Sequence, residues 1–502
     1  MSSLFNRDPQ SPFVALAPGE RILALGFLIV TAFLASFVAL TSETPGSVVA
    51  VTAFVAYLAA LSLPFVIRDF KPSVFHPLVF YVLWMGFRGV LEGDAVLAAT
   101  GLEFHRALPG LTVRELNHLV ALSFALEAIA LVALYVGYAF APWLRIPQWR
   151  APEPTGAVWR CALWVGVAAI GLLMLIRIGG GIDQVLMQRG LASDQRISAQ
   201  VGGQWNFLAG IGVVATLVWL ACQPAAVKKP AFWILLLAAL SIRFAATGSR
   251  GGIVTPMLMI GTVWVLQHRR IPYRAVFAGV FCALLLIGFL GEFRATSQQV
   301  SALDDVQLEG GLKDWAVRAI EELERHAGAN NGQLAILGRV PHDVPYLYGE
   351  SYLSIPFVFV PSAVWGAKPE AGGKLNAIRI YDQPLTAIPP GAVGEAYWNF
   401  SYPGIVLVFL VYGVFLKWVA CAYHANAGHS LIMVIFVYSL FYLQPTTPSI
   451  YGFFHAIVPA VFIWWTLVAR FRFRYTASKA DSSPLGVPRA GNIVTQHTRN
   501  HI

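Results

Sequence analysis

Charged residues are scarce in this sequence. Asp, Glu, Lys and Arg together make up 12% of the 502 residues, whereas about a quarter is usual in water-soluble domains. Hydrophobic residues make up 57%, and the mean hydropathy is +0.64. This balance excludes an ordinary water-soluble protein. We therefore expect an all-α polytopic membrane protein.

Cysteine and recognisable catalytic motifs are also scarce. The four cysteines lie in apolar runs or at their ends, without zinc-site spacing, which argues against a disulfide framework and a thiolate metal site. No phosphate-binding P-loop, HExxH or Ser-His-Asp order occurs. Asp304 and Asp305 have no third ligand at useful spacing. We therefore expect neither a metal nor a cofactor.

The formal net charge of +9 does not point to nucleic acid, because the cations are scattered in short clusters between apolar runs. About twelve runs have helical length. The first is too long for a signal-peptide core and lacks a cleavage pattern. The runs are Ile22–Leu40, Val48–Ile67, Pro77–Val90, Leu119–Phe140, Val158–Ile176, Phe207–Cys222, Phe232–Ala246, Ile253–Leu266, Tyr273–Leu290, Gly404–Ala420, Leu431–Leu443 and Tyr451–Ala469.

The connections between these runs alternate in character, which predicts their orientation. One set is short, basic and nearly free of acid, and by the positive-inside rule it lies in the cytoplasm with both termini. Its cations are Arg68, Lys71, Arg145, Arg150, Lys228, Lys229, Arg269, Arg270, Arg274, Lys417, Arg470, Arg472 and Arg474. The other set faces outward, and a bacterial inner membrane fits this arrangement.

These runs divide the chain into four parts. Residues 1–290 hold helices 1–9, 291–403 form a large periplasmic loop, 404–470 hold helices 10–12, and 471–502 form a disordered cytoplasmic tail. Within the loop, residues 312–328 have the spacing of an amphipathic helix. Ser351–Trp365 is apolar but interrupted by prolines and too short to span, so we expect a re-entrant segment.

A polar turn, Thr247–Gly252, separates the seventh and eighth runs. The eighth run rises about 24 Å, less than the roughly 30 Å of a bilayer core, so the turn is expected below the membrane surface. Ser249 can cap the following helix, Gly251 permits close approach, and Arg250 presents a fork suited to phosphate oxygens. The alternative is a tight hairpin whose arginine reaches lipid headgroups. Arg243 lies seven residues before Arg250: the two share a face if the helix is unbroken, and contact with lipid headgroups explains Arg243 equally well.

Other candidate residues lie on the outward side. Arginines around a pit at the outer face would suit a lipid-linked pyrophosphate, a nearby carboxylate could act as a base, and aromatic rings could stack on sugars. Arg318 and Arg325 more simply pair with neighbouring glutamates. The remaining candidates are Arg177, Arg189, Arg196, Arg294, Lys368, Arg379, Glu350, Glu395, Tyr352, Tyr397 and Asn399.

Three motifs in the second half resemble one known family. They are the turn at residues 247–252, Tyr348–Leu353 with the later Lys368-Pro369, and Gly394–Phe400. In order and placement they are similar to those of the oligosaccharide repeat-unit polymerases, the Wzy or O-antigen polymerase family. Two positions depart from that pattern: Ser362 stands where an arginine is common, and Ser401 where a glycine is expected.

The resemblance implies a GT-C-like glycosyltransferase. Such an enzyme joins an undecaprenyl-pyrophosphate-linked glycan donor to the non-reducing end of another lipid-linked repeat unit at the periplasmic face. It uses no nucleotide sugar, and a chain-length regulator is a candidate partner. We expect Glu395 as general base rather than Glu350, because it precedes the tenth run and lies close to Tyr397 and Asn399, which could hold the acceptor sugar. The alternative is a structural Glu395 that pairs with an arginine.

Two other functions remain open from the sequence. An O-antigen ligase would use the same donor but pass the glycan to lipid A-core. A flippase or transporter of lipid-linked or anionic substrates would also need broken helices and inward-facing arginines. Transporters more often show two related halves, and no internal repeat is visible here.

Overall fold

The structure, a computed structural model, describes residues 15–41, 45–67, 72–98, 108, 110–149, 156–181, 203–248, 251–297, 311, 315, 317, 319, 331–360, 365–384 and 387–469. Within these ranges the regular elements are helices. The tail and most of the predicted amphipathic helix lie outside them, although Trp315, Val317 and Ala319 are helical.

Each of the twelve apolar runs lies on a helix. The helices are α2 (Pro18–Thr41), α3 (Ser47–Val66), α4 (Pro77–Ala98), α5 (Val113–Phe140), α6 (Ala157–Ile178), α9 (Gly203–Cys222), α10 (Pro230–Thr247), α11 (Gly251–His268), α12 (Tyr273–Ser297), α17 (Ala392–Ala425), α18 (Ser430–Tyr442) and α19 (Thr447–Val468). Among the described residues, eight of these helices are long and apolar enough to cross a membrane, namely α2, α3, α5, α6, α9, α10, α17 and α19. The chain is thus a multi-pass, all-α membrane protein, and twelve spans stay a prediction.

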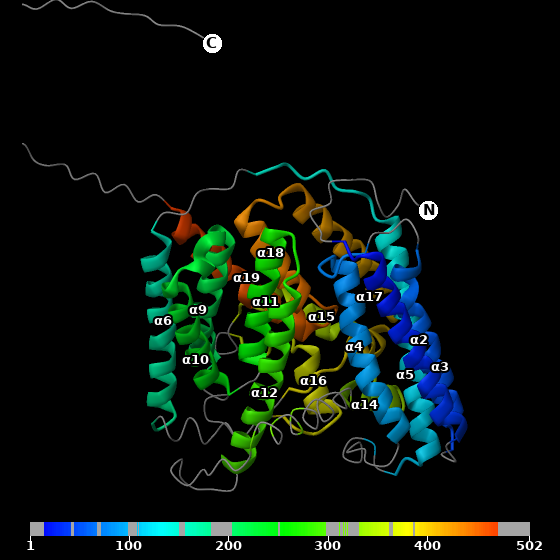
Figure 1. Ribbon diagram of the computed structural model, residues 1–502. Coiled ribbons are helices and arrows are strands. Elements are labelled where there is room, and N and C mark those ends of the chain that lie inside the picture. Colours follow the sequence, from blue (N-terminus) through cyan, green and yellow to red (C-terminus); the bar gives the residue numbers. More distant parts are fainter. Residues whose placement is uncertain are drawn as a thin grey trace, which may run out of the picture.

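The two described ends of the chain lie at the same end of the bundle (Figure 1). The basic connection η3 (Pro224–Lys228) lies at that end too. The short helices α14 (Asn331–Arg339) and α16 (Gly372–Arg379) lie toward the opposite end, and α15 (Glu350–Leu353) lies nearer the middle of the bundle. The described ends and this basic connection thus share one end of the bundle, and their cytoplasmic orientation stays a prediction.

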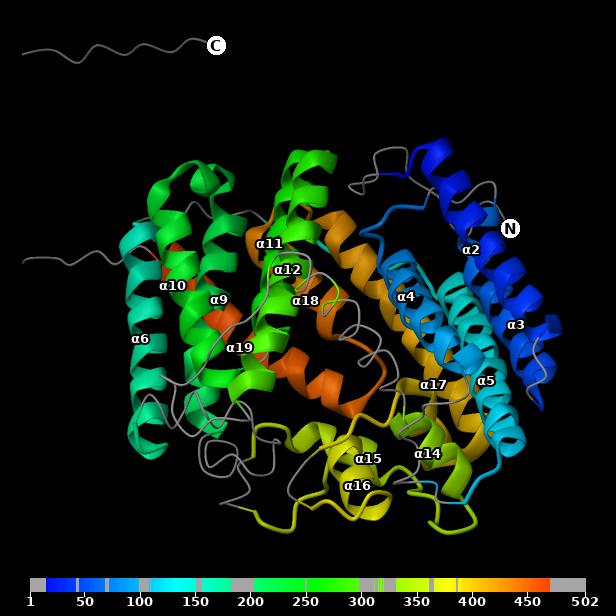
Figure 2. The ribbon, with the colours of Figure 1, turned by 60° about the horizontal axis from the view of Figure 1, so that its bottom comes forward.

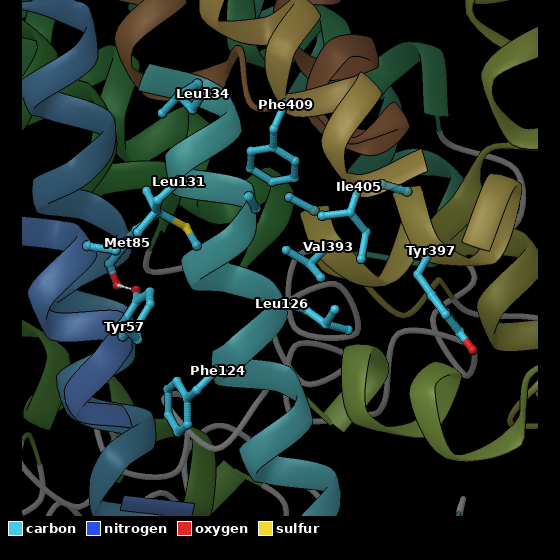
Figure 3. Close-up of a cluster of buried hydrophobic side chains, with 14 of the residues drawn as sticks. Tyr57, Met85, Phe124, Leu126, Leu131, Leu134, Val393, Tyr397, Ile405 and Phe409 are labelled. Atoms are coloured by element: carbon cyan, nitrogen blue, oxygen red, sulfur yellow. Dashed lines mark hydrogen bonds between the residues drawn. The ribbon is translucent and has the colours of Figure 1, made fainter. Parts of the chain in front are cut away.

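The helices form two groups with separate cores (Figure 2). One core joins α3, α4, α5 and α17: Leu131 of α5 lies beside Met85 of α4, and Phe409 and Ile405 of α17 lie on the opposite side of α5 (Figure 3). The other core joins α6, α9, α10, α11, α18 and α19 around the fully buried Trp219.

Two glycines explain the close approach of α5 and α17. A Cβ added to Gly137 would lie 2.0 Å from the Leu410 carbonyl oxygen, and one added to Gly413 would lie 2.2 Å from the Leu134 carbonyl oxygen. Small residues allow this contact. In lipid, where the hydrophobic effect does not drive helices together, close packing of this kind holds them together.

Helix α17 differs from the sequence prediction. It begins at Ala392, so the last residues assigned to the large loop form its first turns. A kink at Phe400 and Ser401 separates these turns from the rest of the helix. Ser401 has φ 57° and ψ −155°, a conformation that is essentially restricted to glycine. The backbone at Ser401 is therefore one that glycine would adopt with less strain.

One cation predicted in a cytoplasmic connection lies elsewhere. Lys417 is inside α17 and only 4% exposed. Its Nζ lies 4.8 Å from the ring centroid of Tyr138 and 5.6 Å from that of Trp143. The assignment of Lys417 to a loop was wrong, because these rings hold its charge within the helix bundle.

Candidate functional site

A buried polar cluster in the described chain surrounds Glu395, in the first turns of α17. This side chain has no exposed surface. Its Oε1 accepts a hydrogen bond from Thr447 Oγ1 at 2.6 Å, and its Oε2 accepts one from the Thr447 backbone N–H at 3.0 Å. Because Thr447 is the first residue of α19, the carboxylate lies at the positive end of that helix.

A third element reaches the same carboxylate. The backbone N–H of Gly372, at the start of α16, donates to Thr447 Oγ1 at 2.7 Å. A Cβ added to Gly372 would lie 2.3 Å from Glu395 Oε1, so only glycine lets the backbone come this close. The carboxylate therefore joins α16, α17 and α19.

Asn399 and Tyr352 extend the cluster. Asn399 Nδ2 donates to Ser351 Oγ and to the Glu395 carbonyl oxygen, each at 2.8 Å. Asn399 Oδ1 and Tyr352 Oη are buried without a hydrogen-bond partner among the described residues. Burial, followed by the nearby Glu395 carboxylate, raises the pKa of Tyr352 well above its ordinary value. Because buried polar atoms are normally paired, these two suit a polar ligand.

A second site lies among α9, α10, α11, α18 and α19. It is a cavity of about 440 Å³, and its polar lining includes Arg243, Thr247, Tyr438, Tyr442 and His455. Gly251 and Gly252, the first residues of α11, also line it.

Among the described residues that line this cavity, Arg243 is the only arginine, and there is no lysine. Its Nη1 donates to the Asn206 carbonyl oxygen at 2.9 Å. No ion pair joins it to a carboxylate of the described residues. A Cβ on Gly210 would lie 3.1 Å from Nη1, so this glycine makes room for the guanidinium. An arginine with spare donors beside a helix N-terminus is suited to bind an anion.

Helix α19 connects the two sites. Thr447 contacts Glu395, and His455 lines the cavity about two turns later, roughly 12 Å along the helix. The predicted re-entrant segment packs on this stretch: Tyr451 Oη donates to the Ser354 carbonyl oxygen at 2.7 Å, and the Phe359 ring centroid lies 5.9 Å from that of His455.

The structure brings some predicted site residues together and separates others. Glu395, Asn399 and Tyr352 meet in one cluster, and Gly251 lies at the cavity. Glu350 instead pairs with Arg379 at 2.8 Å, with both side chains partly exposed.

The remaining predicted residues contribute to neither site or cannot be placed. Lys368 Nζ donates to the Val360 carbonyl oxygen at 2.8 Å, Tyr397 Oη donates to the Val340 carbonyl oxygen at 3.3 Å, and Arg177 is exposed at the end of α6. Outside the described residues lie Arg189, Arg196, Ser249, Arg250, Arg318 and Arg325, as well as the side chain of Arg294 on α12.

Three residues of the Glu395 cluster were not selected from the sequence, nor were Tyr438, Tyr442 and His455 of the cavity. Thr447 follows a threonine and precedes a proline, which is a typical helix start, and that signal alone does not identify a partner for Glu395. Ser351 and Gly372 carry no local signal of their role. His455 lies within an apolar run, and an ionisable residue in such a run is the signal that could have marked it as a candidate site residue.

Comparisons of the chain with protein-family models, with curated proteins and with solved structures found no match. The fold and the two sites define a class: a multi-pass helical membrane protein with a buried carboxylate cluster and an arginine-lined cavity, joined by one helix.

Proposed function

We propose that this chain is a glycosyltransferase with a GT-C-like fold, located in the bacterial inner membrane. It polymerises undecaprenyl-pyrophosphate-linked oligosaccharide repeat units into O-antigen, capsule or exopolysaccharide at the periplasmic face. The observation that carries the proposal is the pairing of an arginine-lined cavity with a buried carboxylate cluster along α19.

The cavity is the proposed position of the donor pyrophosphate. Arg243 offers guanidinium donors, and the N-terminus of α11 at Gly251 and Gly252 adds backbone N–H groups and a favourable dipole. Arg250, which immediately precedes α11 in the sequence, is the proposed second cation. Negative charge develops on the pyrophosphate as its bond to the sugar breaks. Stabilising that charge would lower the barrier to the reaction.

Glu395 is the proposed general base. It would accept the proton of the acceptor hydroxyl while that oxygen attacks the donor sugar carbon, and the lipid pyrophosphate departs. Asn399 Oδ1 and Tyr352 Oη, which lack described partners, would hold the acceptor sugar nearby. Since Glu395 has no exposed surface, acceptor binding must open the contact between Gly372 and the carboxylate.

The test is deletion of the gene followed by gel analysis of lipopolysaccharide or capsule. Products with a single repeat unit support the polymerase. Loss of all attached glycan would identify a ligase with the same donor. Build-up of lipid-linked units inside the cell would identify a flippase, and either of these results would overturn the proposal.

A further inference from the structure

A groove of about 610 Å³ lies between α3, α5 and α17. These helices belong to the other half of the bundle from α9, α10 and α11, which line the Arg243 cavity (Figure 2). Every residue lining the groove is alanine, valine, leucine or isoleucine. A surface without any hydrogen-bonding side chain cannot recognise a polar ligand, so its occupant must be hydrocarbon.

The shape of the groove favours a single chain over a protein helix. Ala60 and Ala133 are its most recessed residues, at 7% and 6% exposed, whereas Ile129, Val132 and Val406 are 42–48% exposed. Helices associate closely in membranes where small residues form the outermost surface. Here Ala60 and Ala133 form the recessed floor, the exposed Ala56 and Ala59 line the α3 side, and branched side chains stand at the other edges, which leaves a channel for a flexible lipid chain.

The outward end of the groove leads to tyrosines. Tyr402, Val406 and Leu410 are spaced four residues apart after the kink and so lie along one face of α17. Tyr402 is 51% exposed, and its ring centroid lies 5.2 Å from that of Tyr397. From the groove, this face of α17 therefore leads directly to aromatic rings on the side of the bundle that carries α14 and α16.

The tyrosines continue onto the outward segment. The ring of Tyr346 lies 5.9 Å from that of Tyr397 and 6.2 Å from that of Tyr348, which is 78% exposed. Tyr397 itself is only 4% exposed, so we call Tyr346, Tyr348 and Tyr402, the partly or fully exposed rings around it, the tyrosine row. Rings with an apolar face and a polar hydroxyl suit a sugar, which also has an apolar face and polar edges.

We propose that the groove binds the polyprenyl chain of the acceptor and that the tyrosine row binds its sugars. This inference rests on the proposed function, because a polymerase needs two lipid-linked substrates and the Arg243 cavity accounts for the donor alone. Asn399 lies three residues before Tyr402, across the kink in α17, and Glu395 lies one turn before Asn399. The acceptor would thus approach Glu395 from the half of the bundle opposite the donor.

The experiment places the full-length protein in liposomes with undecaprenyl phosphate that carries a diazirine in its chain. After illumination, mass spectrometry locates the labelled peptides. Labels should concentrate on groove peptides of α3, α5 and α17, in addition to any at the Arg243 cavity. Ala59→Phe, at an exposed alanine of the groove, should lower groove labelling about tenfold, the change produced by about 1.4 kcal/mol of lost binding.

Ala162→Phe is the matched control, since Ala162 is also exposed but lies on α6, away from the groove. It should leave groove labelling unchanged. Even labelling of all exposed helices, or equal effects of the two variants, would overturn the lipid site. Efficient cross-linking of two copies through a cysteine placed at Val132 would overturn it as well, because the groove would then be a dimer interface.

Tyr348→Ala tests the sugar part of the inference, and the high exposure of Tyr348 leaves the fold little affected. It should raise the acceptor KM without changing groove labelling, and an unchanged KM would refute the tyrosine row. Elongation is measured in parallel. Groove labelling without any elongation would refute the proposed polymerase activity and support the lipid site. Elongation without groove labelling would refute the lipid site alone.

Discussion

Replacing Glu395 separates its chemical role from its structural one. Glu395→Ala leaves the Thr447 backbone N–H and hydroxyl without their buried acceptor. Each unsatisfied group costs about 1–3 kcal/mol, so the loss in stability is about 2–6 kcal/mol before the cavity is counted. We expect this variant to accumulate poorly and to melt at a lower temperature.

Glu395→Gln has nearly the same shape and a milder effect. Its oxygen can still accept from the Thr447 N–H, and its NH2 group can donate to Thr447 Oγ1 once that hydroxyl turns. Charge-assisted hydrogen bonds become neutral ones about half as strong, a loss of about 1 kcal/mol. The variant should therefore fold, but it can no longer accept a proton from the acceptor hydroxyl.

The assay compares purified wild type, Glu395→Gln and Thr447→Val for melting temperature, binding of lipid-linked repeat units and chain elongation. Glu395→Gln should keep binding and lose elongation by at least about a hundredfold, the usual contribution of a general base. Thr447→Val should lose stability while keeping some elongation. Elongation near wild type in Glu395→Gln, or loss of binding together with elongation, would refute the base and leave Glu395 as a structural link between helices.

Three further predictions concern other parts of the molecule. Arg243→Ala should weaken donor binding at least tenfold and Arg243→Lys should restore little, whereas Arg177→Ala, at an exposed helix end, should bind donor normally; similar behaviour of the two alanine variants would argue against a pyrophosphate site. Gly413→Val should prevent accumulation in the membrane because α5 leaves no space for a side chain, while Gly166→Val, where a Cβ meets nothing within 4 Å, should accumulate normally; equal yields would contradict the close helix contact. A reporter inserted at the exposed His342 should be periplasmic and one fused after α19 cytoplasmic, and a reversed signal at either position would reject the orientation.

The sequence alone determined the class of the protein and the position of its helices. All twelve apolar runs lie on helices. For the eight helices long enough to cross a membrane, the reason is that a backbone in lipid must satisfy its hydrogen bonds within the segment. The turn after α10 follows from local chemistry too: Gly248 has φ 60° and ends one helix, and Gly251 begins the next.

Only the tertiary structure decided which side chains meet. Glu395 was selected for its neighbours Tyr397 and Asn399, yet its partner is Thr447 on a different helix. Lys417 carries the charge typical of a cytoplasmic loop, and only the packing of α5 against α17 shows that aromatic rings enclose it. Periodicity specifies which positions can form a helix. It does not specify which helices pair, because pairing depends on whether the glycines and side chains of two helices far apart in the sequence fit against each other.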